Sequence, residues 1–113
     1  MPIEKENLNM LKEIIGDDLK EVIESYLAAS PNLLQQMQIC INSEDADGIQ
    51  LHSHTLKGAS ANIGATQLPN LCLQLESAAK TGVVTADFQT MLDAIQVEAQ
   101  KVEQMLQEYM QQF

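Results

Sequence analysis

Hydrophobic residues recur along most of the chain at intervals of three and four, the spacing that places them on one face of an α-helix. They do not alternate with polar residues as they would in a half-buried β-strand, and residues that favour helices, such as leucine, glutamine, glutamate and alanine, are frequent throughout. Residues that begin or end helices divide the pattern into segments. The pattern predicts five helices, at about 4–15, 18–42, 45–63 and 66–81, and from Thr85 to about 111.

Glycines and capping residues mark the ends of these segments. Gly16 is suited to the left-handed conformation that ends a helix, and the run "NSEDADG" at 42–48 offers caps and a turn. Thr66 and Thr85 are the expected N-caps of the last two helices. Pro69 then falls in a first turn, where its missing N–H costs nothing.

Pro31 lies inside the second segment, where a proline removes a donor and crowds the preceding turn. The helix therefore either bends there or restarts with Ser30 as its N-cap. One long helix that bends is the favoured interpretation.

Short loops between long amphipathic helices make consecutive helices antiparallel. The predicted fold is all-α: an antiparallel up-down-up-down four-helix bundle with a short extra N-terminal helix across one end. A length of 113 residues fits a single domain, 1–113.

Charge and composition narrow the functional classes. Six basic against sixteen acidic side chains give a net charge of −10, the wrong sign for binding nucleic acid. No segment reaches the roughly 18 apolar residues of a membrane span, and the acidic start does not resemble a secretory signal, so a cytoplasmic protein is expected. Cys40 and Cys72 lack C-x-x-C spacing and are interpreted as small core residues.

The stretch "HSHTLKG", residues 52–58, holds both histidines of the chain. If Leu56 faces the core, His54 points roughly 160° away from it, to solvent, while His52 lies beside the apolar stripe as a structural residue. Two histidines two apart on a helix point about 200° apart and cannot chelate one metal ion. No metal site and no cofactor are predicted.

Lys57 and Gly58, three and four residues after His54, are its nearest neighbours on the helix surface. A glycine in a helix interior costs roughly 1 kcal/mol relative to alanine. Its lack of a side chain would let another molecule approach His54, although close packing of two helices is an alternative. A positive charge at Lys57 beside an accessible imidazole suits a phosphoryl group. The chain has no G-x-x-x-x-G-K-[ST] loop with which to phosphorylate itself from ATP.

The run "HTLKGASANIGATQLPNLCLQLE", residues 54–76, resembles the core of histidine phosphotransfer (HPt) domains of two-component phosphorelays. The resemblance rests on a histidine followed by L-K-G, then small residues, a glycine and an L-x-x-x-C-x-x-L-E run. It implies a four-helix bundle whose exposed histidine, His54, accepts a phosphoryl group from an aspartyl phosphate on a receiver domain and passes it to another receiver aspartate.

The same resemblance implies roles for the neighbouring residues. Lys57 would stabilise the phosphoryl charge and Gly58 would give the receiver access. Glu76 stands where several members have glutamine and would orient the imidazole, and Lys80 would add a second positive charge. Glu76 and Lys80 are four apart, however, so an ordinary surface ion pair between them is the simpler interpretation.

The implied partners are response-regulator receiver domains, which would carry the Mg²⁺, and a hybrid sensor histidine kinase is a further candidate. The protein is expected to be a monomer with no nucleic-acid partner and no membrane insertion. Helical angle places Leu51 and Ala61 at the centre of a docking surface around His54. The alternative is a helical interaction adaptor without phosphoryl chemistry. Whether the chain is free-standing or part of a hybrid sensor kinase, and which receivers it serves in which direction, stay open.

Overall fold

In the computed structural model, which describes residues 1–113, the chain forms five α-helices and no strand longer than one isolated bridge. They are α1 (Lys5–Ile15), α2 (Asp18–Asn42), α3 (Ala46–Asn62), α4 (Leu68–Ala79) and α5 (Asp87–Met110). Each lies within about two residues of its predicted bounds.

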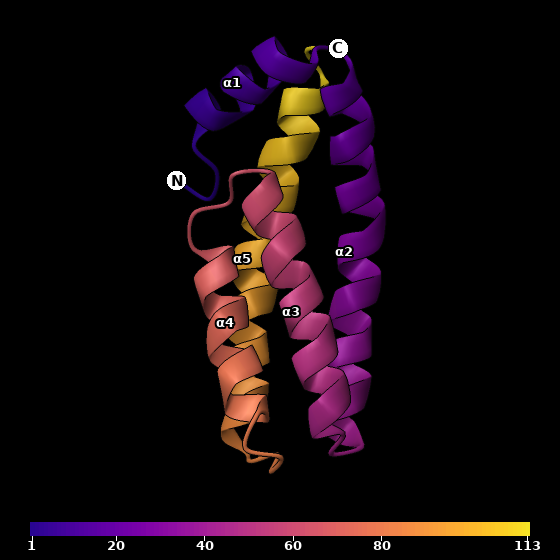
Figure 1. Ribbon diagram of the computed structural model, residues 1–113, viewed down its shortest axis with the longest axis vertical. Coiled ribbons are helices and arrows are strands. Elements are labelled where there is room, and N and C mark those ends of the chain that lie inside the picture. The colour runs from indigo at the N-terminus through magenta and orange to yellow at the C-terminus, as the bar shows by residue number, and fades with distance from the viewer.

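The four long helices form an elongated bundle of 44 × 21 × 20 Å, with α1 across one end (Figure 1). Consecutive helices run in opposite directions. α3 packs between α2 and α4, and α5 closes the bundle by packing against the same two helices on the other side. The predicted four-helix bundle with an extra N-terminal helix is confirmed.

One cluster of 22 buried apolar residues fills the bundle, and every helix contributes to it. On α3 the buried stripe contains Ile49, Ser53, Leu56 and Ser60. The two serines are satisfied within the helix, because Ser53 Oγ donates to the Ile49 carbonyl (2.6 Å) and Ser60 Oγ to the Lys57 carbonyl (3.1 Å). This stripe fixes the rotation of α3 and turns its opposite face outward.

Several predicted helix ends and core residues are confirmed. Gly16 follows α1 with a φ of 61°, and the Asp45 carboxylate caps α3 by accepting the Gly48 N–H at 3.0 Å. α2 continues through Pro31, so Ser30 does not start a new helix. Cys40 and Cys72 are both buried and free.

The two threonine caps were predicted wrongly. α4 begins at Leu68 after Gln67, and Thr66 instead binds the chain start: its hydroxyl donates to the Met1 carbonyl and its N–H to the Pro2 carbonyl. The extended N-terminal residues, paired to this turn through Ile3 and Ala65, supply the competing partners. At α5 the cap position is Ala86, and no side chain caps that end. None of the five helices is long and apolar enough to cross a membrane.

Candidate functional site

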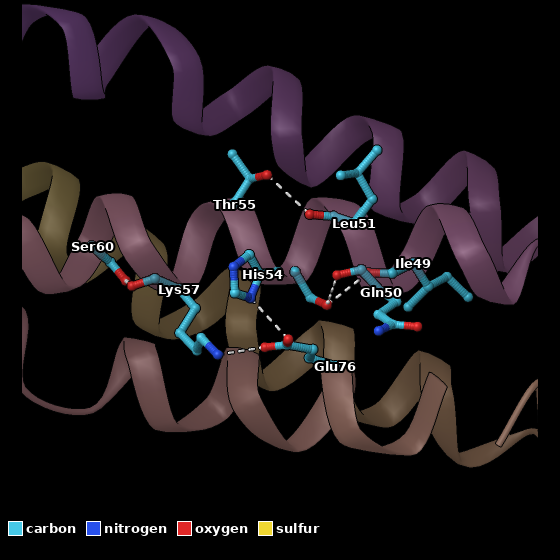
Figure 2. Close-up of polar contacts among 9 residues, drawn as sticks. Ile49, Gln50, Leu51, His54, Thr55, Lys57, Ser60 and Glu76 are labelled. Carbon is cyan, nitrogen blue, oxygen red and sulfur yellow. Dashed lines mark hydrogen bonds and ion pairs between the residues drawn. The ribbon is translucent and has the colours of Figure 1, made fainter. Parts of the chain in front are cut away.

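His54 lies midway along α3 with 64% of its side chain exposed, so the predicted outward orientation is confirmed. Its Nδ1 lies 2.9 Å from Glu76 Oε2 on α4 (Figure 2). A carboxylate only accepts hydrogen bonds, so we assign the ring proton to Nδ1. The other nitrogen, Nε2, then keeps its lone pair and points away from the carboxylate.

Glu76 is buried, with 5% of its surface exposed, and its carboxylate serves two partners. Lys57 Nζ lies 2.7 Å from Oε1, while His54 contacts Oε2. Figure 2 shows both side chains reaching from α3 to the same carboxylate. The hydrogen bond from Lys57, helped by that from His54, holds the pKa of Glu76 below its ordinary value although burial acts in the opposite direction. The carboxylate is therefore ionised at neutral pH.

The expected surface ion pair between Glu76 and Lys80 is wrong. Lys80 is exposed and lies within ion-pair distance of no carboxylate. Glu76 turns toward α3, where Lys57 meets it. A spacing of four along one helix could not reveal this competitor, because Lys57 comes from the neighbouring helix.

Gly58 lies on the exposed face of α3, four residues after His54. A Cβ atom built at this position meets nothing within 4 Å. Close packing of helices therefore does not explain the glycine, and the surface beside His54 is open to another molecule.

An open hollow of about 400 Å³ adjoins His54 on the side of the α3 N-terminus. It brings Lys80 and the exposed Leu51 next to the ring. Its remaining wall includes Asp47 and Gln50, which were not singled out in the sequence. Asp47 and Gln50 precede His54 by seven and four residues, which places them on the same face of the helix. This spacing is the sequence signal that could have identified them.

His52 is partly exposed and its ring makes no hydrogen bond, in keeping with a place at the edge of the apolar stripe. The two histidines do not share a site. No group of three or more His, Cys, Asp or Glu side chains is arranged to hold a metal ion.

An exposed imidazole on a four-helix bundle, held by a neighbouring helix, is the arrangement that the sequence resemblance implied. The family model of the Hpt domain matches residues 21–112, and the chain therefore belongs to the Hpt domain family. It is a histidine phosphotransfer protein of the phosphorelay type; such proteins work with receiver domains and in general are not kinases.

A solved structure with the same fold is that of histidine-containing phosphotransfer protein B (HptB) from Pseudomonas aeruginosa PAO1. The TM-score is 0.92 at 21% sequence identity, and the alignment covers 99% of this chain and 96% of that one. No curated protein matches the chain. The family match begins in α2, at residue 21, whereas the structural alignment covers 99% of the chain and therefore includes α1.

Proposed function

We propose that His54 is the phosphoacceptor, taking a phosphoryl group from an aspartyl phosphate on one receiver domain and passing it to an aspartate on another. One observation carries this proposal: the exposed ring is held through Nδ1 by a buried, ionised carboxylate 2.9 Å away. That contact leaves Nε2 as the nucleophile and aims it at solvent.

In the proposed step, the Nε2 lone pair attacks phosphorus and the bond from phosphorus to the aspartyl oxygen breaks. The carboxylate of the receiver leaves with the electron pair. The imidazole, which still carries its Nδ1 proton, becomes positively charged, and Glu76 stabilises that charge through the existing hydrogen bond. Return transfer follows the same path in reverse.

Lys57 has two parts in this scheme. While the histidine is free, its ammonium group offsets the charge of Glu76, which would otherwise repel an incoming phosphate. When the phosphoryl group is present on Nε2, Lys57 is the nearest cation on α3 to stabilise its oxygens. Lys80, at the rim of the hollow beside His54, adds a second positive charge.

The receiver supplies the rest of the chemistry. We propose that it brings the Mg²⁺ and the acidic pocket, and that Gly58 allows this pocket to reach His54. The protein itself acts as a monomeric carrier without ATP binding, independent kinase activity or a cofactor. Response-regulator receivers are the partners, and a hybrid sensor histidine kinase is a candidate donor.

Intact mass measurement after incubation with phosphoramidate at neutral to mildly alkaline pH tests the assignment, using the wild type, His54→Gln and His52→Gln. We expect one acid-labile phosphate on the wild type and on His52→Gln, and none on His54→Gln. Equal labelling of all three, or loss of label in His52→Gln, would overturn the role of His54. If none of the three proteins takes phosphate from phosphoramidate or from a phosphorylated receiver, the protein is instead a helical interaction adaptor without phosphoryl chemistry.

A further inference from the structure

The buried carboxylate of Glu76 faces a proton that the proposed transfer step leaves on the ring of His54. The Glu76 side chain is only 7% exposed, and its Oε2 lies 2.9 Å from Nδ1 of a ring that is 64% exposed (Figure 2). The Nδ1 proton therefore lies between an exposed ring and an acceptor that water hardly reaches. Whether the ring keeps this proton decides how readily it can release phosphate.

Release of phosphate depends on the protonation of the ring. When an aspartate oxygen of a receiver attacks phosphorus, the bond from phosphorus to Nε2 breaks and its electron pair goes to Nε2. A ring that still carries the Nδ1 proton leaves as neutral imidazole. A ring that has lost this proton to solvent must leave as an imidazolate anion, which is a much poorer leaving group. The protonated form of the phosphohistidine is therefore the one that transfers rapidly.

A phosphorylated imidazole without a partner would lose this proton in the neutral range. With phosphorus on Nε2 and a proton on Nδ1, the ring resembles an imidazolium ion, and histidine in water gives up that charge at about pH 6.5. At about pH 7.5, roughly nine-tenths of such rings would have lost the proton. Transfer from the ring to a receiver would then slow as the pH rises.

Glu76 opposes this loss, because it is an ionised acceptor in contact with the proton. The hydrogen bond from Lys57 holds the pKa of Glu76 below its ordinary value, so the carboxylate keeps its charge through the neutral and mildly alkaline range. An opposite charge in hydrogen-bond contact favours the charged form of the ring, and burial of the carboxylate weakens screening by water. A glutamine at this position could accept the same hydrogen bond but would bring no charge.

The other ionisable groups around the phosphorylated ring come from α3 and α4. Lys57 and Lys80 favour loss of the proton, whereas Asp47 and the phosphoryl group itself favour its retention. Cys72, one turn before Glu76 on α4, stays a neutral thiol because burial raises its pKa to about 12. α2 and α5 place no ionisable group along the hollow. Among the residues named here, Glu76 is the one in hydrogen-bond contact with the ring.

We infer that Glu76 retains the Nδ1 proton of phosphorylated His54 into the mildly alkaline range, so that the ring leaves as neutral imidazole and transfer to the receiver stays fast there. The inference rests on the proposed function, because it concerns a ring phosphorylated on Nε2. Glu76 acts through the ring rather than on phosphorus, so it is a positioning residue for the proton. Its charge, and not only its shape, sets the pH range over which the protein can donate phosphate.

Rapid-quench measurement of transfer from the phosphorylated protein to a Mg²⁺-loaded receiver domain, between about pH 6.5 and 8.5, tests the inference. The receiver is one that accepts phosphate from the wild type in a panel of purified receiver domains. The variant is Glu76→Gln. The matched control is Glu98→Gln, which removes the same charge from another buried glutamate, on a helix that does not contact α3. Rates are expressed relative to the control at the same pH, so that titration of the receiver itself cancels.

The two proteins should differ in the slope of their pH profiles. Relative to the control, wild-type transfer should change less than about threefold over this range, whereas transfer by Glu76→Gln should fall by about tenfold or more as the pH rises. A purely structural role of Glu76 would shift the rates by the same factor at every pH. Parallel profiles for the wild type and Glu76→Gln would therefore overturn the inference.

The ¹⁵N chemical shift of Nδ1 in the phosphorylated wild type gives a second readout that does not depend on how the variant folds. We expect the shift of a protonated nitrogen up to about pH 8.5, and loss of the proton near pH 6.5 would overturn the inference. Phosphoramidate labelling of His54 tests the proposed function separately. If His54 takes the label and the two pH profiles are parallel, only the inference about Glu76 fails. If His54 takes no phosphate from any donor, both fail.

Discussion

At the residue scale, the site depends on one buried acid, Glu76, that contacts both a histidine and a lysine. Glu76 accepts from His54 through one oxygen and pairs with Lys57 through the other. A buried carboxylate is stable only when it is paired and hydrogen-bonded, and here the residues that satisfy it are those proposed for the chemistry. The position of the His54 ring and the position of the Lys57 ammonium group therefore both depend on the Glu76 side chain.

Replacing Glu76 by glutamine removes its charge and nearly keeps its shape, whereas replacing it by alanine removes both. Glutamine keeps an oxygen that can accept the Nδ1 proton, whereas alanine leaves both the ring and Lys57 without a partner. We expect Glu76→Ala to slow phosphotransfer to receivers by about tenfold or more and to lower the free energy of unfolding by about 1–3 kcal/mol. Glu76→Gln should transfer faster than Glu76→Ala. Rapid-quench transfer assays and urea unfolding measure both effects, and equal transfer by the two variants would contradict an orienting role.

Glu76 should also make stability depend on pH. Its pKa in the folded protein lies below the ordinary 4.5, chiefly because Lys57 donates to it. A depressed pKa contributes stability that is fully present above the unfolded value and is lost as the pH falls through the folded value. The stability difference between wild type and Glu76→Gln should therefore hold from pH 7 to about 5 and shrink below pH 4.5. Urea unfolding across this range would disprove the linkage if the difference stayed constant.

Substitutions of Gly58 are expected to affect stability and phosphotransfer in opposite directions. Because a Cβ there meets nothing within 4 Å, Gly58→Ala should raise the free energy of unfolding by about 0.5–1 kcal/mol. Gly58→Leu should place a bulky side chain where the receiver approaches, and transfer to receivers should fall while the fold is retained. Urea unfolding and transfer rates on the same samples test this. A destabilised Gly58→Ala, or unimpaired transfer by Gly58→Leu, would contradict the account.

At the scale of the helices, the capping residues give a direct comparison. The Asp45 carboxylate accepts the Gly48 N–H at 3.0 Å, so Asp45→Ala should cost about 1 kcal/mol in the free energy of unfolding. No side chain caps the start of α5, so Thr85→Val should change stability by no more than about 0.5 kcal/mol. Equal losses of stability in the two variants, measured by thermal or urea unfolding, would contradict the assignment of Asp45 as a helix cap and of Thr85 as a residue that caps nothing.

Prediction from the sequence succeeded where the determinants are local. The apolar spacing set the five helices, and the offset from Leu56 was enough to orient His54. It failed where the partner lies far along the chain. Thr66 looks like an ordinary cap until the first two residues of the chain fold back onto it. Spacing along its own helix makes Glu76 look like a surface acid; the family resemblance implied its contact with His54, but nothing in the sequence indicated the ion pair with Lys57 on the neighbouring helix.

At the scale of the whole molecule, the bundle explains why such separated residues meet. α3 and α4 lie side by side and antiparallel, which brings residue 76 beside residue 54. The fold class and the short phosphotransfer motif could be predicted from the sequence, since a repeated apolar pattern and a compact motif specify them. The hollow beside His54 could not be predicted, because it is formed by two helices whose relative position only the packed core determines.

In the proposed function, His54 carries the phosphoryl group on Nε2 while its Nδ1 stays hydrogen-bonded to Glu76. Long-range ¹H–¹⁵N and ³¹P NMR of protein labelled with ¹⁵N-histidine, phosphorylated by a receiver at mildly alkaline pH, tests it directly. We expect a nitrogen–phosphorus bond at Nε2 of His54, a protonated Nδ1 and an unchanged His52 ring. Phosphorus on Nδ1, on His52 or on neither histidine would contradict it.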